Sequence, residues 1–330
     1  MKDNKPMYSP ETLHQRINEA FSRLVLPPEP SNLYNPVVYT LSQGGKRLRP
    51  MLVLAACDML EGDIEEAIHP AAGIEIFHNF TLLHDDIMDQ APLRRGKETV
   101  YKKWNFNIAI LSGDTMFALA NREIVKTRAA VIPALVELFN TTAIQVCEGQ
   151  QYDMDFETRD DVSISGYLEM IRLKTAVLLA CSLKTGALIG GASSISQDLI
   201  YDAGINLGMA FQLKDDYLDT FGDEKVFGKT PGGDIHAGKK TWMILRLLEK
   251  AGEEREKLSE LYDQHSVLPP ADKIGLFKDE FIAKGIPGEI NELIDKYYTA
   301  AKGSLEKLAV PAERKTVLLA MIDSLVSREK

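Results

Sequence analysis

The sequence predicts an all-α fold, and three observations support this prediction. Apolar residues recur three and four positions apart, for example over residues 37–60 and 208–222, which is the spacing of an amphipathic helix. No segment shows the alternation of a strand or an Asn-Gly hairpin turn. Turn signals divide the chain into helix-length pieces, at residues 26–32, 60–63, 190–197, 227–234, 268–273 and 285–289. We therefore expect a single domain of long, mostly buried helices over residues 1–330.

Several pieces carry a local signal of their own. The segment SISQDLI (194–200) begins with serine and PADKIGLF (270–277) begins with proline, and both residues favour a helix start. The most apolar segment, residues 175–192, is interrupted by Lys184 and by glycines. A membrane span needs about 20 mostly apolar residues, so this segment is expected to be buried helix.

Composition excludes some classes of protein. The net charge of −10 argues against general nucleic-acid binding, which needs a basic surface. Cys57, Cys147 and Cys181 are odd in number and lack the spacing of metal ligands, so we expect small buried thiols in a reducing compartment. The first 13 residues lack the apolar core of a signal peptide. We expect a cytoplasmic protein without integral membrane association.

The stretch HDDIMD places carboxylates on one face of a predicted helix. Asp85 and Asp89 are four residues apart and share that face, while Asp86 lies about 100° round from Asp85. Two carboxylates at roughly 6 Å repel by about 3 kcal/mol at an effective dielectric near 20, so a cation is expected to compensate them. Oxygen ligands without histidine or cysteine at matched spacing favour Mg²⁺ or Mn²⁺.

A second copy of the pattern strengthens this interpretation. FQLKDDYLD carries Asp215, Asp216 and Asp219 in the same D-D-x-x-D arrangement, again among apolar residues. Mg²⁺ keeps several waters and shares substrate phosphates instead of filling an all-protein cage. Two acidic helix faces of this kind can hold metals between them, and the metals can hold a diphosphate.

Basic residues cluster next to glycines in this acidic chain. They are Lys46, Arg47 and Arg49 in GGKRLRP, Arg94, Arg95 and Lys97 after the first aspartates, Arg172 and Lys174 in RLKT, Lys229 in FGKTPGGD, and Lys239 and Lys240 in AGKKTW. Any one of them could be a solvated surface charge. As a group beside two acidic motifs, they indicate contacts to phosphate.

Together these motifs resemble those of the trans-isoprenyl diphosphate synthases, the polyprenyl synthetase family, and in particular its short-chain farnesyl and geranylgeranyl diphosphate synthases. The resemblance rests on LLHDDIMD followed by LRRG, on FQLKDDYLD and on GGKRLRP, and it runs from about residue 40 to 245. It implies a single-domain antiparallel helical bundle of the isoprenoid synthase type with a central active-site cavity. It also implies a homodimer.

The resemblance also implies roles for individual residues. Asp85 and Asp89 would bind two Mg²⁺ ions and Asp215 a third, with Asp86, Asp216 and Asp219 as nearby or water-mediated partners; Mn²⁺ is an alternative metal. Arg94, Lys174, Lys229 and Lys239 would contact the allylic diphosphate. Isopentenyl diphosphate would be held by Gly45, Lys46, Arg49, His78 and Arg95. Thr175 and Gln212 would lie over the reacting carbons. The expected allylic partners are dimethylallyl, geranyl and farnesyl diphosphate.

The implied reaction is that of a prenyltransferase. Metal ions and lysines would stabilise the departing diphosphate, so that the allylic C–O bond ionises. Isopentenyl diphosphate would attack the resulting cation through its double bond, and loss of a proton would restore an alkene. Positioning and charge stabilisation would supply most of the catalysis.

The residues before the first aspartate motif bear on product length. Phe80 lies five positions before Asp85, about 7.5 Å along a helix axis, and Phe77 lies eight positions before it. Such a stripe is usually core packing, but in the family a bulky residue at the fifth position forms the floor of the tunnel for the growing chain. The fourth position is Thr81 and not a second aromatic residue, which favours a geranylgeranyl (C20) over a farnesyl (C15) product.

Two other functions fit part of the pattern. A class I terpene cyclase shares a D-D-x-x-D motif and metal-assisted ionisation, but its second motif normally has Asn, Ser and Glu. A family member that has lost activity could serve as a regulatory subunit of a prenyl synthase, although every expected motif residue is present here.

Overall fold

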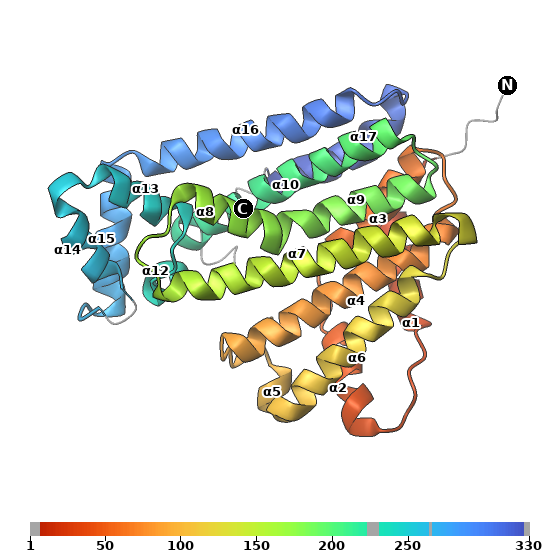
Figure 1. Cartoon of the computed structure of the whole chain (residues 1–330), viewed down its shortest axis with the longest axis horizontal. Helices are drawn as coiled ribbons and strands as arrows, with labels where there is room; N and C mark the ends of the chain where they lie inside the picture. The colour runs from red at the N-terminus through yellow and green to blue at the C-terminus, as the bar shows by residue number, and fades with distance from the viewer. Residues whose placement is uncertain (1–6, 223–230, 264–265, 327–330) are drawn as a thin grey trace. The chain divides into compact units, whose positions relative to one another are not determined.

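The computed structural model describes residues 7–222, 231–263 and 266–326 (Figure 1). Clustering of contacts divides the chain into two compact units. Unit 1 comprises Met1–Asn140, Cys181–Asp198 and Ala309–Leu318, and unit 2 comprises Thr141–Ala180, Leu199–Leu308 and Leu319–Lys330. Each unit is built almost entirely from helices, so the prediction of an all-α protein is confirmed. The prediction of one domain over residues 1–330 stays a prediction.

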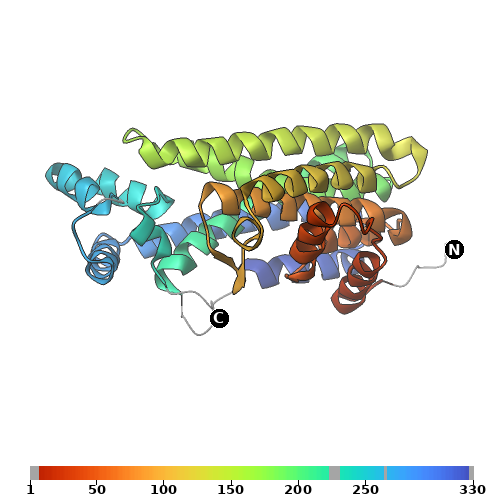
Figure 2. The same ribbon diagram turned by 90° about the horizontal axis from the view of Figure 1, so that it is seen from below.

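Unit 1 begins with a series of helices coloured red to yellow in Figure 1. They are α1 (Pro10–Ser22), α2 (Ser31–Ser42), α3 (Leu48–Met59), α4 (Ile64–Met88), α5 (Val100–Lys103), α6 (Phe106–Ile124) and a 3₁₀ turn (Ala129–Val131). Helix α4 packs against both α3 and α6, and Figure 2 shows α1 to α3 in red to orange. Their shared core includes Leu52, Leu54, Ile74 and Phe77, all fully buried.

Four helices contain residues of both units. They are α7 (Ile132–Thr158), α9 (Val177–Ile189), α10 (Ser194–Phe221) and α17 (Ala312–Val326). The predicted helix start at the serines of residues 194–200 is confirmed, because α10 begins at Ser194 and the Ser193 hydroxyl accepts the Ser196 amide. The apolar segment of residues 175–192 forms buried helix as expected, and its exceptionally low exposure includes Leu179 and Leu183 at 0%.

The remaining helices of unit 2 lie within residues 164–176 and 233–306. They are α8 (Ile164–Ile171), a π-helical turn (Arg172–Ala176), α12 (Gly233–Ala237), α13 (Trp242–Lys250), a 3₁₀ turn (Gly252–Glu254), α14 (Arg255–Tyr262), α15 (Pro270–Ala283) and α16 (Ile286–Glu306). Helices α13, α14 and α15 contact one another, and α16 contacts α13 and α15 (Figure 2). The predicted start of a helix at Pro270 is confirmed.

One short hairpin departs from the expectation that the chain has no strands. Strands β1 (Leu93–Arg94) and β2 (Lys97–Glu98) pair antiparallel around a two-residue loop. The loop residues Arg95 and Gly96 have φ of 53° and 73°, as a type I′ turn requires. This turn was not predicted, because arginine, unlike asparagine, is not a usual first residue of a type I′ turn.

The cysteines agree only in part with the prediction of buried thiols. All three cysteines are free thiols, but only Cys57 and Cys181 are buried; Cys147 is exposed, so the prediction of burial is wrong there.

The helix over Ala129–Thr158 is apolar and long enough to cross a membrane, and 28% of its most apolar window is buried. One such helix is weak support for a span, because helices of soluble proteins pass the same test.

Candidate active site

The first aspartate motif lies at the end of α4 in unit 1. Asp89 is the residue that caps this helix, and its amide donates to the Asp85 carbonyl at 2.8 Å. Asp85 is half-buried and Asp89 is exposed, whereas Asp86 is buried at 5% exposure. Two carboxylates of the motif are therefore accessible at the helix end, and the third points into protein.

Asp86 pairs with Arg94 of β1. The Arg94 Nε donates to Asp86 Oδ1 at 2.6 Å. Burial raises the pKa of the Asp86 carboxyl, and the Arg94 guanidinium offsets only part of this rise. Thr99, which follows β2, donates its hydroxyl to the Ala91 carbonyl at 2.8 Å and so fixes the base of the hairpin. The hairpin thus holds Arg94 beside the first motif, where it pairs with Asp86; its contact with a phosphate stays a prediction.

The segment of residues 44–49, named the isopentenyl diphosphate loop after its predicted ligand, enters α3 at Leu48 and lies next to the hairpin. The Arg95 Nη1 donates to the Gly44 carbonyl, and the Arg95 guanidinium also lies against Gly45. At the other side of the loop, Arg49 Nη1 lies 3.1 Å from Nε2 of His78 on α4. The structure therefore brings together Gly45, Arg49, His78 and Arg95, which the family resemblance implied as one substrate site, and Lys46 is exposed in the same segment.

The charge around His78 is strongly positive. Burial lowers the pKa of the His78 imidazole well below its usual value, and Arg49, Arg95, Arg94 and Arg47 lower it further, in that order. The imidazole is therefore neutral at pH 7 and can accept a hydrogen bond from Arg49. A neutral histidine among arginines is an environment that favours an anion.

The second aspartate motif lies on α10 in unit 2 and takes part in a chain of hydrogen bonds. Thr175 donates to the Gln212 side-chain oxygen at 2.9 Å, and the Gln212 amide donates to Asp216 Oδ1 at 2.9 Å. Tyr167 of α8 donates its hydroxyl to Asp216 Oδ2. Asp215 and Asp219 are half-buried. Thr175 and Gln212, predicted to act together, are in direct contact.

Close helix approach creates this arrangement. A Cβ on Gly208 of α10 would lie 2.3 Å from the Ala176 Cα, and one on Gly149 of α7 would lie 2.2 Å from the Lys174 backbone nitrogen. Glycine at these two positions lets α10 and α7 pack tightly against the π-helical turn. Such turns are frequent at functional sites, and this one carries Lys174 and Thr175.

Lys174 pairs with a carboxylate that sequence reasoning missed as a site residue. The Lys174 Nζ donates to Asp153 Oδ2 at 2.5 Å. Asp153 lies on α7, one turn after Gly149. Burial would raise the pKa of Asp153, but Lys239 and Lys174 outweigh it and hold the pKa below its usual value. Neither residue spacing nor a local motif signals this contact, because the two residues are 21 positions apart.

Residues 232–241 fold back under the second motif. The Asp234 amide donates to Asp219 Oδ2 at 2.8 Å, the Lys239 amide donates to the Asp234 carbonyl at 2.9 Å, and Tyr262 donates its hydroxyl to the Lys239 carbonyl at 2.8 Å. Asp234 is a second residue that the sequence did not single out. Lys229 lies outside the described residues.

Asp216 gives an observation on metal binding. Burial first, and Asp234 second, raise the pKa of Asp216 to about 7, although Lys239, Tyr167 and Gln212 lower it. Within residues 7–222, 231–263 and 266–326, no group of three or more Asp, Glu, His or Cys is placed so that it could by itself hold a metal ion. Accessible carboxylates on open helix faces, beside a buried carboxyl that needs positive charge, fit a hard cation that keeps waters and shares a ligand's phosphates.

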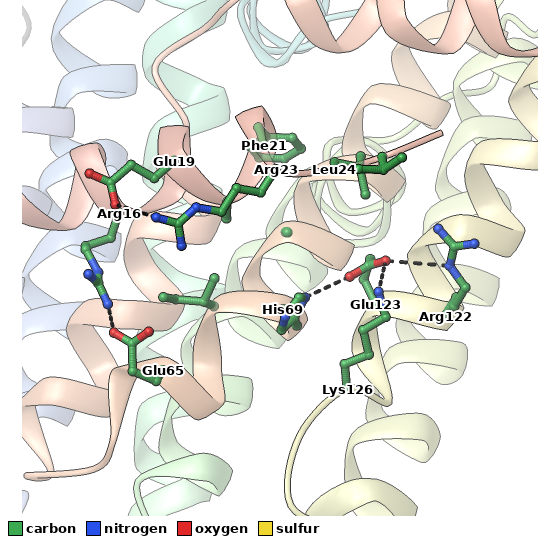
Figure 3. Close-up of a pocket in the computed structure, with 14 residues that line it drawn as sticks. Arg16, Glu19, Phe21, Arg23, Leu24, Glu65, His69, Arg122, Glu123 and Lys126 are labelled. Atoms are coloured by element: carbon green, nitrogen blue, oxygen red, sulfur yellow. Dashed lines mark hydrogen bonds and ion pairs between the residues drawn. The ribbon is translucent and has the colours of Figure 1, made fainter. Parts of the chain in front are cut away.

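The cavities of unit 1 do not all lie at these motifs. A cavity of about 360 Å³ between α1, α4 and α6 contains none of the predicted site residues (Figure 3). Glu123 is buried there and accepts hydrogen bonds from His69 and Lys126 at 2.9 and 2.6 Å. A much smaller cavity of about 10 Å³ is lined by residues that include Asp86, Arg94 and Arg95. The candidate active site is therefore defined by the charged residues of the two aspartate motifs and not by the volume of the larger cavity.

The product-length residues lie in an aromatic cluster of unit 1. The Phe80 ring is 5.5 Å from Phe77, 5.6 Å from Phe117 of α6 and 4.7 Å from His84. Phe77 is fully buried, whereas Phe80 is half-buried. Thr81 turns its hydroxyl to the His78 carbonyl at 2.8 Å. Phe80 therefore keeps an accessible face that Phe77 lacks.

The fold and the site thus define an all-α protein with two aspartate motifs, each beside arginine or lysine. A polyprenyl synthetase family model matches residues 30–270, and the chain belongs to that family. It is accordingly a prenyltransferase.

Individual relatives agree with this assignment. A geranylgeranyl diphosphate synthase of Methanosarcina mazei is 35% identical over 315 residues, 95% of each chain. A geranylfarnesyl diphosphate synthase of Aeropyrum pernix is 35% identical over 309 residues, 91% of this chain and 96% of its own. A crystal structure of a geranylgeranyl pyrophosphate synthase superposes with a TM-score of 0.93 at 44% identity, covering 98% of this chain and 100% of the other.

Proposed function

We propose that the chain is a geranylgeranyl diphosphate synthase that adds isopentenyl diphosphate to dimethylallyl, geranyl and farnesyl diphosphate. The observation that carries this proposal is the pair of arginines, Arg49 and Arg95, that lies with neutral His78 and the glycine-rich segment next to the first aspartate motif. Such a set suits a diphosphate held apart from the metal-binding carboxylates. The names of the relatives, geranylgeranyl and geranylfarnesyl diphosphate synthase, support a product of C20 or longer.

Synthases of this family generally depend on Mg²⁺. In this proposal Asp85 and Asp89 hold two Mg²⁺ ions and Asp215 holds a third, with Mn²⁺ as a substitute and with Asp86, Asp216 and Asp219 as neighbouring partners. Bound Mg²⁺ would supply positive charge to the leaving diphosphate. The oxygen-only donor sets and the raised pKa of buried Asp216 support this assignment.

The chain's own residues would act at defined points of the reaction. Lys174, Lys239, Lys229 and Arg94 would bind the allylic diphosphate, which departs with the electron pair of the C–O bond. The double bond of isopentenyl diphosphate would then form the new C–C bond. Thr175 and Gln212 would face the developing cation with a hydroxyl and an amide dipole, and the proton lost in the last step would go to the released diphosphate.

Gly45, Lys46, Arg49, His78 and Arg95 would hold isopentenyl diphosphate in position. The Arg49 and Arg95 guanidinium groups offer paired N–H donors that match phosphate oxygens. The contacts of Arg49 with His78 and of Arg95 with Gly44 fix both groups before a ligand arrives. Such preorganisation lowers the ordering cost of binding and aligns the nucleophilic double bond.

The proposal includes a homodimer in the cytoplasm. Exposed apolar residues support a subunit contact on α6, at Phe106, Ile110 and Leu111, and on α7, at Ile144, Tyr152 and Met154. Free cysteines suit a reducing compartment. Sedimentation equilibrium should give twice the 36.7 kDa chain mass, and Ile144→Glu should shift it to the monomer. A monomeric wild-type protein would contradict this part of the proposal.

A turnover assay with isopentenyl diphosphate and each allylic starter, with and without Mg²⁺, tests the function and separates it from the two alternatives. Linear condensation products that require Mg²⁺ support the synthase. Cyclic hydrocarbons formed without consumption of isopentenyl diphosphate would indicate a terpene cyclase. An absence of turnover with every starter would indicate a non-catalytic regulatory subunit.

A further inference from the structure

Arg47 differs from the other basic residues of its loop. In GGKRLRP it stands between Lys46 and Arg49, and by sequence all three are candidates for phosphate contacts. Lys46 is exposed and Arg49 is half-buried, but Arg47 is only 6% exposed. Its guanidinium group therefore contacts other residues of the protein and is not accessible to a ligand.

The Arg47 guanidinium has three partners in unit 1. Nη1 donates to Glu75 Oε1 at 3.0 Å, Nη2 donates to the Leu41 carbonyl at 2.7 Å, and the guanidinium carbon lies 4.4 Å from the centre of the Phe21 ring. Phe21 also lines the cavity shown in Figure 3. These contacts tie the loop to α2 through Leu41 and to α1 through Phe21.

Glu75 joins the loop to α4. It is 2% exposed, and the Asn79 side-chain amide donates to its carboxylate at 3.3 Å and to its carbonyl at 2.8 Å. Glu75 lies on α4 one turn before His78 and Asn79, and ten residues before Asp85. A buried ion pair with hydrogen bonds on both partners holds one geometry, because breaking it leaves an uncompensated buried charge.

The backbone of the loop depends on this anchor. Arg47 has φ 48° and ψ 35°, a left-handed conformation that is unfavourable for a residue with a side chain, and its carbonyl starts α3 by accepting the Met51 amide at 3.1 Å. This reversal sets the directions in which Lys46 and Arg49 leave the chain. Side-chain contacts must compensate for its cost, and Arg47 itself makes three of them, with Glu75, Leu41 and Phe21.

Glu75 also acts on the far side of the loop. Burial lowers the pKa of Arg95, Glu75 raises it, and Arg47 and Arg94 lower it. One buried carboxylate thus balances part of the charge of several arginines. The loop between residues 44 and 49 is held on its inner side by Arg47 and on its outer side by Arg95.

We propose that Arg47 and Glu75 are a positioning pair that sets the geometry of the isopentenyl diphosphate loop. The inference rests on the proposed function, since it requires that Lys46, Arg49 and Arg95 bind that substrate. Neither residue touches the ligand. Their effect reaches it through the direction of Lys46 and Arg49 and through the charge balance at Arg95.

The test measures KM for each substrate separately in Glu75→Gln, which keeps the shape of the side chain and removes its charge. KM for isopentenyl diphosphate should rise about tenfold, while KM for farnesyl diphosphate stays within about twofold of wild type. Arg47→Lys, which keeps the charge and loses the second hydrogen bond, should show the same selectivity. It carries the test if Glu75→Gln does not fold.

Glu123→Gln is the matched control. Glu123 is a glutamate of unit 1, 1% exposed and bonded to His69 and Lys126 (Figure 3), but it has no contact with the loop. It should lower the melting temperature and leave both KM values unchanged. Equal changes of both KM values in Glu75→Gln, or no change, would overturn the positioning role while wild type still turns over. Wild type without condensation activity would instead refute the proposed function.

Discussion

Lys174 donates a hydrogen bond to Asp153 at 2.5 Å, and the two residues come from different helices of unit 2. Lys174 lies in a π-helical turn, whose wider backbone sets the direction of its side chain, and Asp153 lies on α7 one turn after Gly149. In the proposed reaction Lys174 binds the allylic diphosphate. Asp153 would then fix the position of the Lys174 ammonium group.

Asp153→Asn should lower kcat with allylic substrates about tenfold, because Lys174 loses its charged partner and its fixed position. Steady-state kinetics with farnesyl diphosphate would check this. Asp155→Asn, two residues further on the same helix and exposed, should leave kcat unchanged. Equal effects of both substitutions would show that the charge of α7 matters, and not the contact with Lys174.

Gly45→Ala should raise KM for isopentenyl diphosphate about tenfold. A Cβ at this position would lie 3.0 Å from the Arg95 guanidinium nitrogens, so Arg95 would have to move. Gly44→Ala is a close control, because Gly44 also has a positive φ, 74° against 130°, but its Cβ would meet nothing within 4 Å. The prediction fails if the two variants raise KM equally, since backbone strain alone would then explain the change.

Phe80→Ala should lengthen the main product from C20 to C25 or beyond. The substitution removes the accessible ring from the aromatic cluster with Phe77 and Phe117 and opens the proposed tunnel floor. Mass spectrometry of the dephosphorylated products would measure the chain length. Phe281→Ala, a buried phenylalanine of α15, should cost about 3 kcal/mol of stability or more and leave the chain length unchanged. An unchanged product in Phe80→Ala would remove Phe80 from the floor.

Stability in the absence of metal should depend on pH through Asp216. Its pKa is about 7 in the folded protein and near 4 in an unfolded chain, so the folded state binds more protons between these values. The free energy of unfolding should therefore fall as pH rises from about 4 to about 7, by on the order of 3 kcal/mol. Urea unfolding in EDTA at several pH values would measure this.

Two further measurements belong to the same pH experiment. Asp216→Asn should flatten the pH dependence, and Mg²⁺ should stabilise wild type more at pH 8 than at pH 6, because the cation favours the ionised carboxyl. A wild-type curve in EDTA that rises between pH 4 and 7, with no response to the substitution, would show that Asp216 is not the group responsible.

The sequence predicted the helical architecture and the two aspartate motifs because both depend on local spacing. Helical periodicity led to the all-α fold, and the starts at Ser194 and Pro270 follow from helix-capping preferences. The proximity of Asp85 and Asp89 at the end of α4 follows from their spacing of four residues, about one turn of a helix. The roles assigned to these residues were implied by the family and stay predictions.

What the sequence could not predict depends on contacts between distant residues or on backbone angles. Tyr167 reaches Asp216 across 49 positions, and Asp153 reaches Lys174 across 21. Arg47 and Arg49 have the same charge and nearly the same place in the chain, but Arg47 is buried against Glu75 and Leu41 whereas Arg49 is half-buried beside His78. The hairpin at residues 93–98 was missed for a similar reason, since its turn requires a positive φ at Arg95.

The most direct test of the central claim is the incorporation of labelled isopentenyl diphosphate by the purified chain, with farnesyl diphosphate and Mg²⁺ present. The account predicts that label appears in a linear C20 diphosphate as the main product and that EDTA abolishes the incorporation. Unlabelled hydrocarbon from farnesyl diphosphate, or no incorporation with any allylic starter, would contradict it.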